Sequence, residues 1–186
     1  RIDENTDIKE AAFTVLGSIA LHGLRLSETS LGSKVVVVGL GVIGQLVCRL
    51  AEAQGSEVIG IDPDPERSKY GDNFFTSADD VELKDVDSVI ITAATSSNEP
   101  IELATKIARN KAKIVVIGDI PLNISRNDFY YKELELVVSK SYGPGRYDKQ
   151  YEALGNDYPI EYVRWTENRN FEAFTKLLSQ KQIHLL

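Results

Sequence analysis

Apolar residues recur along this chain with two different periods. Between residues 5 and 26 they are spaced by three and four positions, which is typical of an amphipathic helix. Asn5, Thr6 and Asp7 are the candidate N-caps of this helix. At 34–38 a lysine is followed by four valines, and so short a β-branched run predicts a strand buried on both faces. The chain therefore begins with a helix that leads into a buried strand.

The same two patterns predict the elements that follow. Further strands are expected at 57–61, 74–76, 87–92, 112–118 and 134–139. Helices are expected at 42–54, 63–71, 99–110, 125–131, 148–154 and 167–180. Strands that alternate with helices favour a parallel sheet covered on both faces, and right-handed crossovers favour the strand order 3-2-1-4-5-6. The predicted fold is therefore α/β, a doubly wound Rossmann sheet of six parallel strands.

Length and termini bear on the domain organisation. The chain has 186 residues, which is enough for one domain with a sizeable core. We expect a single domain over 1–186, with a leading helix and linker at 1–30, a six-stranded core at 31–139, and a loop and helical extension at 140–186. The sequence starts at Arg1 and contains no methionine, so we expect a piece of a longer protein.

Three glycines directly after the valine run form the pattern G-x-G-x-x-G. Gly39 permits a tight turn, Gly41 removes a side chain where a pyrophosphate would approach, and Gly44 lets the next helix pack closely. The N-terminus of that helix offers free N–H groups to phosphates. Asp62 ends the second expected strand, where a carboxylate can bind the adenosine ribose hydroxyls and repel a 2′-phosphate. The pattern predicts a dinucleotide site, although a glycine turn that serves packing alone remains the alternative.

In such a sheet the ligand lies beyond the carboxyl ends of the strands, at the switch between strands one and four. Residues 92–95 and 118–120 should therefore line the same crevice as the glycine turn. Arg67 can reach the ribose from the next helix, and its alternative role is that of a solvated helix residue. Because Arg67 could also accept a 2′-phosphate, we expect NAD as the cofactor, with NADP less favoured.

Composition excludes several classes of function. A net charge of −7 argues against a nucleic-acid or anionic membrane surface, and no apolar run reaches the roughly 20 residues of a membrane span. The single cysteine, Cys48, excludes an internal disulfide and fits a cytoplasmic protein. An acidic patch is expected to be solvated surface away from the crevice; its members are Asp79, Asp80, Asp85 and Asp87.

The sequence offers no self-contained catalytic set. Cys48, His22 and His184 are too scattered for a zinc site, so we expect no zinc in this chain. Tyr131 is followed at once by Lys132, which does not fit the Tyr-x-x-x-Lys spacing of a catalytic pair. The catalytic residues are therefore unknown from the sequence.

Two segments, 10–23 and 31–44, resemble the cofactor domain of the medium-chain, zinc-type alcohol dehydrogenase family. Two later segments, 132–148 and 158–171, are similar to bacterial two-domain oxidoreductases associated with surface-polysaccharide synthesis. In those proteins such a dehydrogenase half is fused to a half of the glucose–fructose oxidoreductase type. The resemblance covers essentially the whole chain.

The resemblance implies hydride transfer between nicotinamide and a sugar-like alcohol or carbonyl substrate. By position, the residues implied in cofactor binding are Gly39, Gly41, Val42, Ile43, Gly44, Asp62, Arg67, Thr92, Ala93, Ile117 and Gly118. The family's zinc ligands and proton relay belong to an amino-terminal catalytic domain that has no counterpart here, and we expect that missing domain and NAD(H) as partners. Whether the protein forms a homo-oligomer is left open.

Two alternatives from other classes remain. One is a non-catalytic NAD-sensing module, although such modules usually begin at the first strand without a leading helix. The other is S-adenosylmethionine binding, which an entirely parallel set of six strands disfavours.

The loop at 139–148 combines glycine, proline and tyrosine. Gly143, Pro144 and Gly145 predict a defined turn. Because the loop leaves the last strand, the turn could present Tyr142, Arg146 and Tyr147 to an anionic or sugar-like substrate, or to the missing domain. The alternative is that this cluster only anchors the next helix.

Overall fold

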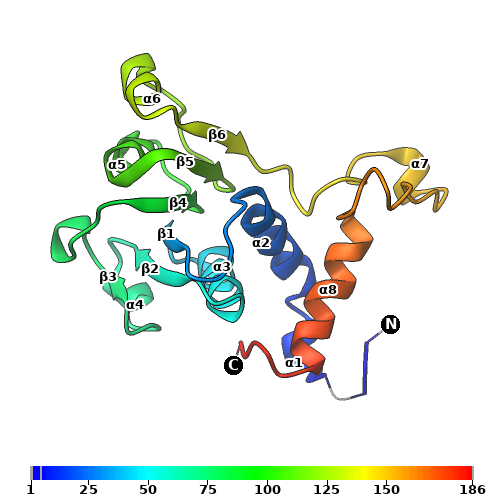
Figure 1. The fold of residues 1–186 in the computed structure, drawn as a ribbon. Helices are drawn as coiled ribbons and strands as arrows, with labels where there is room; N and C mark the ends of the chain where they lie inside the picture. The colour runs from blue at the N-terminus through cyan, green and yellow to red at the C-terminus, as the bar shows by residue number, and fades with distance from the viewer. Residues whose placement is uncertain (1, 5, 186) are drawn as a thin grey trace.

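The fold is built on a six-stranded sheet in the order β3-β2-β1-β4-β5-β6, seen in a computed structural model that describes residues 2–4 and 6–185 (Figure 1). The strands are β1 (Lys34–Val38), β2 (Glu57–Ile61), β3 (Phe74–Phe75), β4 (Val86–Ile91), β5 (Ala108–Val116) and β6 (Glu135–Val138). Every pairing between neighbouring strands is parallel. The predicted α/β class and strand order are confirmed, and the parallel β6 disfavours the S-adenosylmethionine alternative as expected.

Strand β1 is an inner strand of the sheet, with β2 on one edge and β4 on the other. Val36 aligns with Ile59 of β2 on one side and with Val89 of β4 on the other. Strands β2 and β3 lie on one side of β1, and β4, β5 and β6 lie on the other. The loops that follow β1 and β4 therefore leave the sheet in opposite directions, and a crevice opens at the carboxyl end of β1. The turn that follows β1 is therefore placed at the switch point of the fold.

The valines of β1 divide between two apolar cores. Val35 and Val37 pack toward α2 and α3, and Val36 and Val38 pack toward α5. Both cores are needed because side chains alternate across a strand, so four consecutive valines fit only a sheet that is covered on both faces. The helices are α1 (Ile8–Ala11), α2 (Thr14–Leu26), α3 (Val42–Ala53), α4 (Pro65–Ser68), α5 (Glu99–Ile107), α6 (Arg126–Lys132), α7 (Lys149–Glu152) and α8 (Glu167–Ser179).

The leading helix is not continuous, in contrast to the expectation for 5–26. It divides into α1 and α2 at Ala12 and Phe13, and the hydroxyl of Thr14 donates to the carbonyl of Ala11 at 2.6 Å across the break. Asp7 is the N-cap of α1 and accepts from the N–H of Lys9. Asn5, the other N-cap candidate on this segment besides Thr6, lies outside the described residues.

The largest boundary error concerns β5. We expected a helix to 110 and a strand from 112, whereas α5 ends at Ile107 and β5 begins directly at Ala108. Ala108 pairs with Val86 of β4, and the register between β4 and β5 shifts after this pair. Pairing with β4 therefore holds the polar residues 109–111 in a strand that their own sequence does not favour. The remaining predicted ends differ from the observed ones by small offsets, except that 63–71 and 148–154 shorten to single helical turns.

The last helix, α8, packs against α2 rather than directly on the sheet (Figure 1). Phe174 of α8 is fully buried, and its ring lies over Gly17 of α2, where a Cβ atom would come within 2.1 Å of the ring. The described part of the chain contains no helix with the length and apolarity needed to cross a membrane.

Candidate functional site

The glycine turn between β1 and α3 is shaped by two close backbone approaches. Gly39 has a φ of +98°, and a Cβ there would lie 2.6 Å from the backbone nitrogen of Ala93. A Cβ on Gly44 would lie only 1.9 Å from the carbonyl oxygen of Gly39. The fold itself therefore requires glycine at both positions.

Gly41 is different, because no contact among the described residues explains its lack of a side chain. Its φ of −64° suits any residue, and no atom would lie within 4 Å of an added Cβ. The open space lies at the N-terminus of α3, whose first turn has no side-chain cap. Unpaired N–H groups beside an unfilled space suit a phosphate group that comes close to the backbone.

Asp62, at the end of β2, faces this turn and is only 3% exposed. Its Oδ2 atom accepts from the N–H of Leu40 at 2.7 Å, and its Oδ1 atom accepts from the N–H of Asp64 at 2.9 Å. Arg67 also donates to Oδ2, so of the roughly four acceptor positions of a carboxylate about one remains for a ribose hydroxyl. The carboxylate thus fixes the glycine turn and can also contact a ligand in the crevice.

Arg67 of α4 approaches the same carboxylate. Its Nη1 atom lies 3.4 Å from Oδ2 of Asp62, and its Nε atom lies 3.4 Å from Oδ2 of Asp64. The Arg67 side chain is 53% exposed, so it can reach a ribose from the solvent side. Its charge is shared between two carboxylates, which leaves little of it for an added 2′-phosphate.

The turn, the β2 end and the β4 end surround one crevice of about 770 Å³. Its lining includes the predicted residues Gly39, Gly41, Asp62, Arg67, Thr92 and Ala93. It also includes Asp79, which corrects the expectation that the acidic patch is remote from the crevice. Asp87, another member of the predicted patch, lies away from the crevice: it forms an ion pair with Arg109 at the amino ends of the strands.

The carboxyl ends of β4 and β5 close the other side of the turn. The Thr92 hydroxyl donates to the carbonyl of Gly39, which ties the β4 end to the turn. A Cβ on Gly118 would lie 1.9 Å from the carbonyl oxygen of Ala93, so the two strand ends are in close contact. Ile117 packs toward Gly23 of α2, and residues 117–120 are not among those that line the crevice, in contrast to the expectation for 118–120.

Val42 and Ile43 follow the glycine turn in the first turn of α3. Val42 is 51% exposed, whereas Ile43 packs against the core on the α2 side of the sheet. The backbone N–H groups of Val42, Ile43 and Gly44 belong to the first turn of α3, where helical N–H groups have no partner within the helix and can meet a phosphate.

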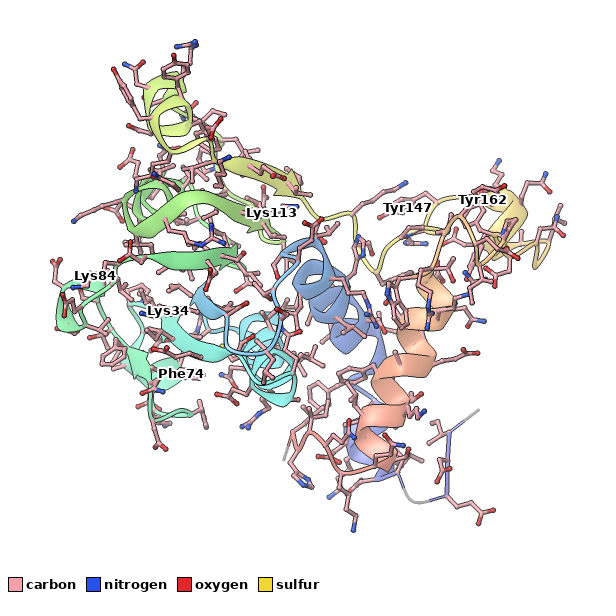
Figure 2. All side chains as sticks on the ribbon, viewed as in Figure 1. Lys34, Phe74, Lys84, Lys113, Tyr147 and Tyr162 are labelled. Atoms are coloured by element: carbon pink, nitrogen blue, oxygen red, sulfur yellow. The ribbon has the colours of Figure 1, made fainter. Side chains whose placement is uncertain are left out.

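The three residues predicted on the 139–148 loop are not among those that line the crevice in the described structure. Arg146 pairs with Glu152 at the end of α7, and its guanidinium lies 4.1 Å from the Tyr147 ring and 5.3 Å from the Tyr142 ring. Figure 2 shows Tyr147 on the same side as Tyr162, far from Phe74 of β3. The geometry favours the alternative in which the cluster anchors its own segment.

The soft-ligand residues do not converge. Among the described residues no three His, Cys, Asp or Glu side chains are grouped to hold a metal ion. Cys48 is fully buried in α3, and burial raises the pKa of its thiol. His22 is buried in α2, where desolvation and then the charge of Arg25 lower its pKa.

The geometry of a glycine turn, an uncapped helix and an acidic strand end agrees with the comparison to protein families. Residues 16–128, more than half of the chain, match the family described as D-isomer specific 2-hydroxyacid dehydrogenase, NAD binding domain. The chain belongs to this family of NAD-binding domains. Dinucleotide binding thus has support from the sequence motif, the geometry and the family match.

Relatives of this NAD-binding domain are dehydrogenases of sugar-like compounds. It is 26% identical to 2-dehydro-3-deoxy-L-galactonate 5-dehydrogenase of Pseudoalteromonas atlantica over 178 residues, which cover 88% of this chain and 49% of that protein. It is 39% identical to D-guloside 3-dehydrogenase of Escherichia coli over 64 residues, which cover 34% of this chain and 18% of that protein. The chain therefore spans about half the length of the first of these relatives.

Solved structures extend the likeness of fold to nearly the whole NAD-binding domain. Galactitol-1-phosphate dehydrogenase from Escherichia coli superimposes with a TM-score of 0.74 at 20% identity, covering 99% of this chain and 53% of that one. A putative zinc-binding dehydrogenase from Sinorhizobium meliloti bound to NADP gives 0.73 at 20% identity, with coverages of 99% and 52%. The family match and the relatives agree with the dehydrogenase cofactor domain that the sequence resembles, and the solved structures, at 20% identity, show the likeness of fold.

Proposed function

We propose that this chain is the cofactor-binding half of an oxidoreductase that transfers hydride between NAD and a sugar-like alcohol or carbonyl substrate. The observation that carries the proposal is Gly41, a glycine that the protein's own packing and backbone do not require. The names of the relatives support a sugar-like substrate. The catalytic residues are expected in the half of the parent protein that this chain does not contain.

Each part of NAD has a proposed place. The pyrophosphate lies against the backbone of Gly41, Val42, Ile43 and Gly44, where α3 offers its N-terminal N–H groups. The adenosine ribose lies against Asp62 and Arg67. The nicotinamide half extends toward the β4 and β5 ends, at Thr92, Ala93, Ile117 and Gly118. The bound cofactor supplies the hydride chemistry, and this chain's residues orient it.

The proposal includes a preference for NAD over NADP. A 2′-phosphate would bring negative charge to the Asp62 carboxylate, which is 3% exposed and so poorly screened by solvent. Arg67 offsets this repulsion only in part, because it is already within 3.4 Å of both Asp62 and Asp64. Solved neighbours carry either cofactor, one NADP and another NADH.

Three further statements about the parent protein are proposals of the same kind. The resemblance of 132–148 and 158–171 supports a two-domain oxidoreductase of surface-polysaccharide synthesis. The lone, unpaired Cys48 is compatible with a cytoplasmic setting. The third proposal is that the parent protein assembles into a homo-oligomer, which light scattering would measure.

Titration calorimetry of two glycine variants tests the proposed function. The unmodified chain should bind NAD more tightly than NADP and should not bind S-adenosylmethionine. Gly41→Ala should keep the melting temperature, since its Cβ meets no atom within 4 Å, but should weaken NAD binding by about tenfold or more. Gly44→Ala should instead lower the melting temperature, because its Cβ would collide with Gly39. Unchanged NAD affinity in folded Gly41→Ala would refute the proposed site.

A further inference from the structure

The crevice continues past the proposed ribose site to the segment that follows β3. The N–H of Asp62 donates to the carbonyl of Phe75 at 3.1 Å, so the end of β3 lies directly beside the ribose-binding carboxylate. A single 3-10 turn, η1 (Ala78–Asp80), comes next. A base attached to the ribose at Asp62 would therefore lie between η1 and the helix on the other side of the crevice.

The walls of this outer part suit a flat ring. Apolar groups line it from both sides, with Ala78 on η1 and Pro100 and Leu103 on α5. Pro100 is buried and Leu103 half-buried, so both belong to the packed surface of α5 rather than to its solvated face. An aromatic base that is held by apolar contacts on its faces would have its polar edge directed along the crevice.

Asp79 is an acidic side chain on the η1 side of this outer part that has no partner among the described residues. Its neighbour Asp80 closes the capping box of η1 by accepting from the N–H of Ser77 and the hydroxyl of Thr76, both at 3.1 Å. The Asp79 carboxylate makes no hydrogen bond or ion pair with residues 2–4 or 6–185, and it lines the crevice. The η1 turn thus holds one carboxylate internally and presents the other to the crevice.

We propose that Asp79 determines specificity for the adenine base by accepting a hydrogen bond from its 6-amino group. A carboxylate only accepts hydrogen bonds, so it suits the amino group of adenine and opposes the 6-oxo group of hypoxanthine. The inference rests on the proposed function, because it requires the dinucleotide to lie with its ribose at Asp62. It adds a preference among purine bases to that site.

Deamino-NAD, in which hypoxanthine replaces adenine, is the probe that isolates this contact. We expect the chain to bind NAD about fivefold more tightly than deamino-NAD in titration calorimetry. Asp79→Ala should bring the ratio close to one, and Asp79→Asn should lower or invert it, since an amide can donate to the 6-oxo group. Asp72→Ala, at an exposed position outside the crevice lining, should keep the ratio of the unmodified chain.

The outcomes separate this inference from the proposed function. If the unmodified chain binds both dinucleotides equally, or if folded Asp79→Ala keeps the full ratio, the role of Asp79 is wrong while NAD binding stands. If neither dinucleotide binds, the proposed function fails and this inference fails with it. The backbone cap of η1 runs from the N–H of Asp79 to Ser77, so Asp79→Ala retains it and should fold normally.

Discussion

The Asp62 carboxylate and the backbone N–H of Leu40 are joined by a 2.7 Å hydrogen bond across 22 residues of sequence. The bond links the end of β2 to the turn after β1, and Leu40 is fully buried. It means that the residue proposed to select NAD also holds the glycine turn in shape. Cofactor binding and local stability are therefore coupled at one carboxylate.

Asp62→Ala should reduce both properties. Removing the carboxylate leaves the buried N–H of Leu40 unpaired, which costs about 1–3 kcal/mol of unfolding free energy. The lost contact to the ribose should weaken NAD binding about tenfold to a hundredfold. Denaturant unfolding and calorimetric titration measure the two effects. Asp72→Ala, which removes an exposed carboxylate outside the crevice lining, is the control and should change both much less.

The sequence was sufficient for the sheet and for the turn at its centre. Four valines in succession fit only a strand covered on both faces, and Val35 and Val36 do face different cores. Gly39 and Gly44 are required by local backbone geometry, which a motif of fixed spacing encodes directly. The valine strand and the glycine turn depend on residues that are close together in the sequence, so the sequence alone predicts them.

The features that the sequence did not predict depend on contacts between distant segments. Asp79 enters the crevice only because β3 pairs with β2, and its own neighbourhood looks like solvated surface. The early start of β5 depends on pairing with Val86. The break after Ala11 interrupts an apolar period that has no proline or glycine at that point. Arg146 has its partner on α7, which sequence spacing did not identify.

Phe174→Ala should be the most destabilising of the single substitutions considered for α8. The ring is fully buried between α8 and Gly17 of α2, and its loss should cost about 3–5 kcal/mol in urea unfolding. Leu177→Ala, at a partly buried position on the same helix, should cost less. Gly17→Ala should also lower the unfolding free energy, because its Cβ would meet the Phe174 ring. The same substitution should cost less in a chain that already carries Phe174→Leu. Additive effects in this pair would contradict the packing contact.

Acid should weaken the fold through His22. Burial and the charge of Arg25 lower the pKa of this imidazole in the folded state. The unfolded chain, in which the pKa is about 6.5, therefore binds the proton more strongly than the folded chain. The unfolding free energy should therefore fall as the pH drops below about 6.5. The raised pKa of Glu167, caused first by burial, acts in the opposite direction at lower pH. Comparing His22→Gln with the unmodified chain across this range isolates the histidine, and a curve that His22→Gln leaves unchanged would exclude it.

Arg146→Ala should loosen the segment after β6 without affecting the cofactor. The guanidinium pairs with Glu152 and lies against the Tyr142 and Tyr147 rings, and none of these residues lines the crevice. Limited proteolysis should therefore cleave the 139–166 segment faster, while NAD affinity stays within about twofold. Glu152→Gln should reproduce the effect, and the double substitution should add little because both remove one ion pair. An NAD affinity that falls as far as in Gly41→Ala would instead bring the loop into the cofactor site.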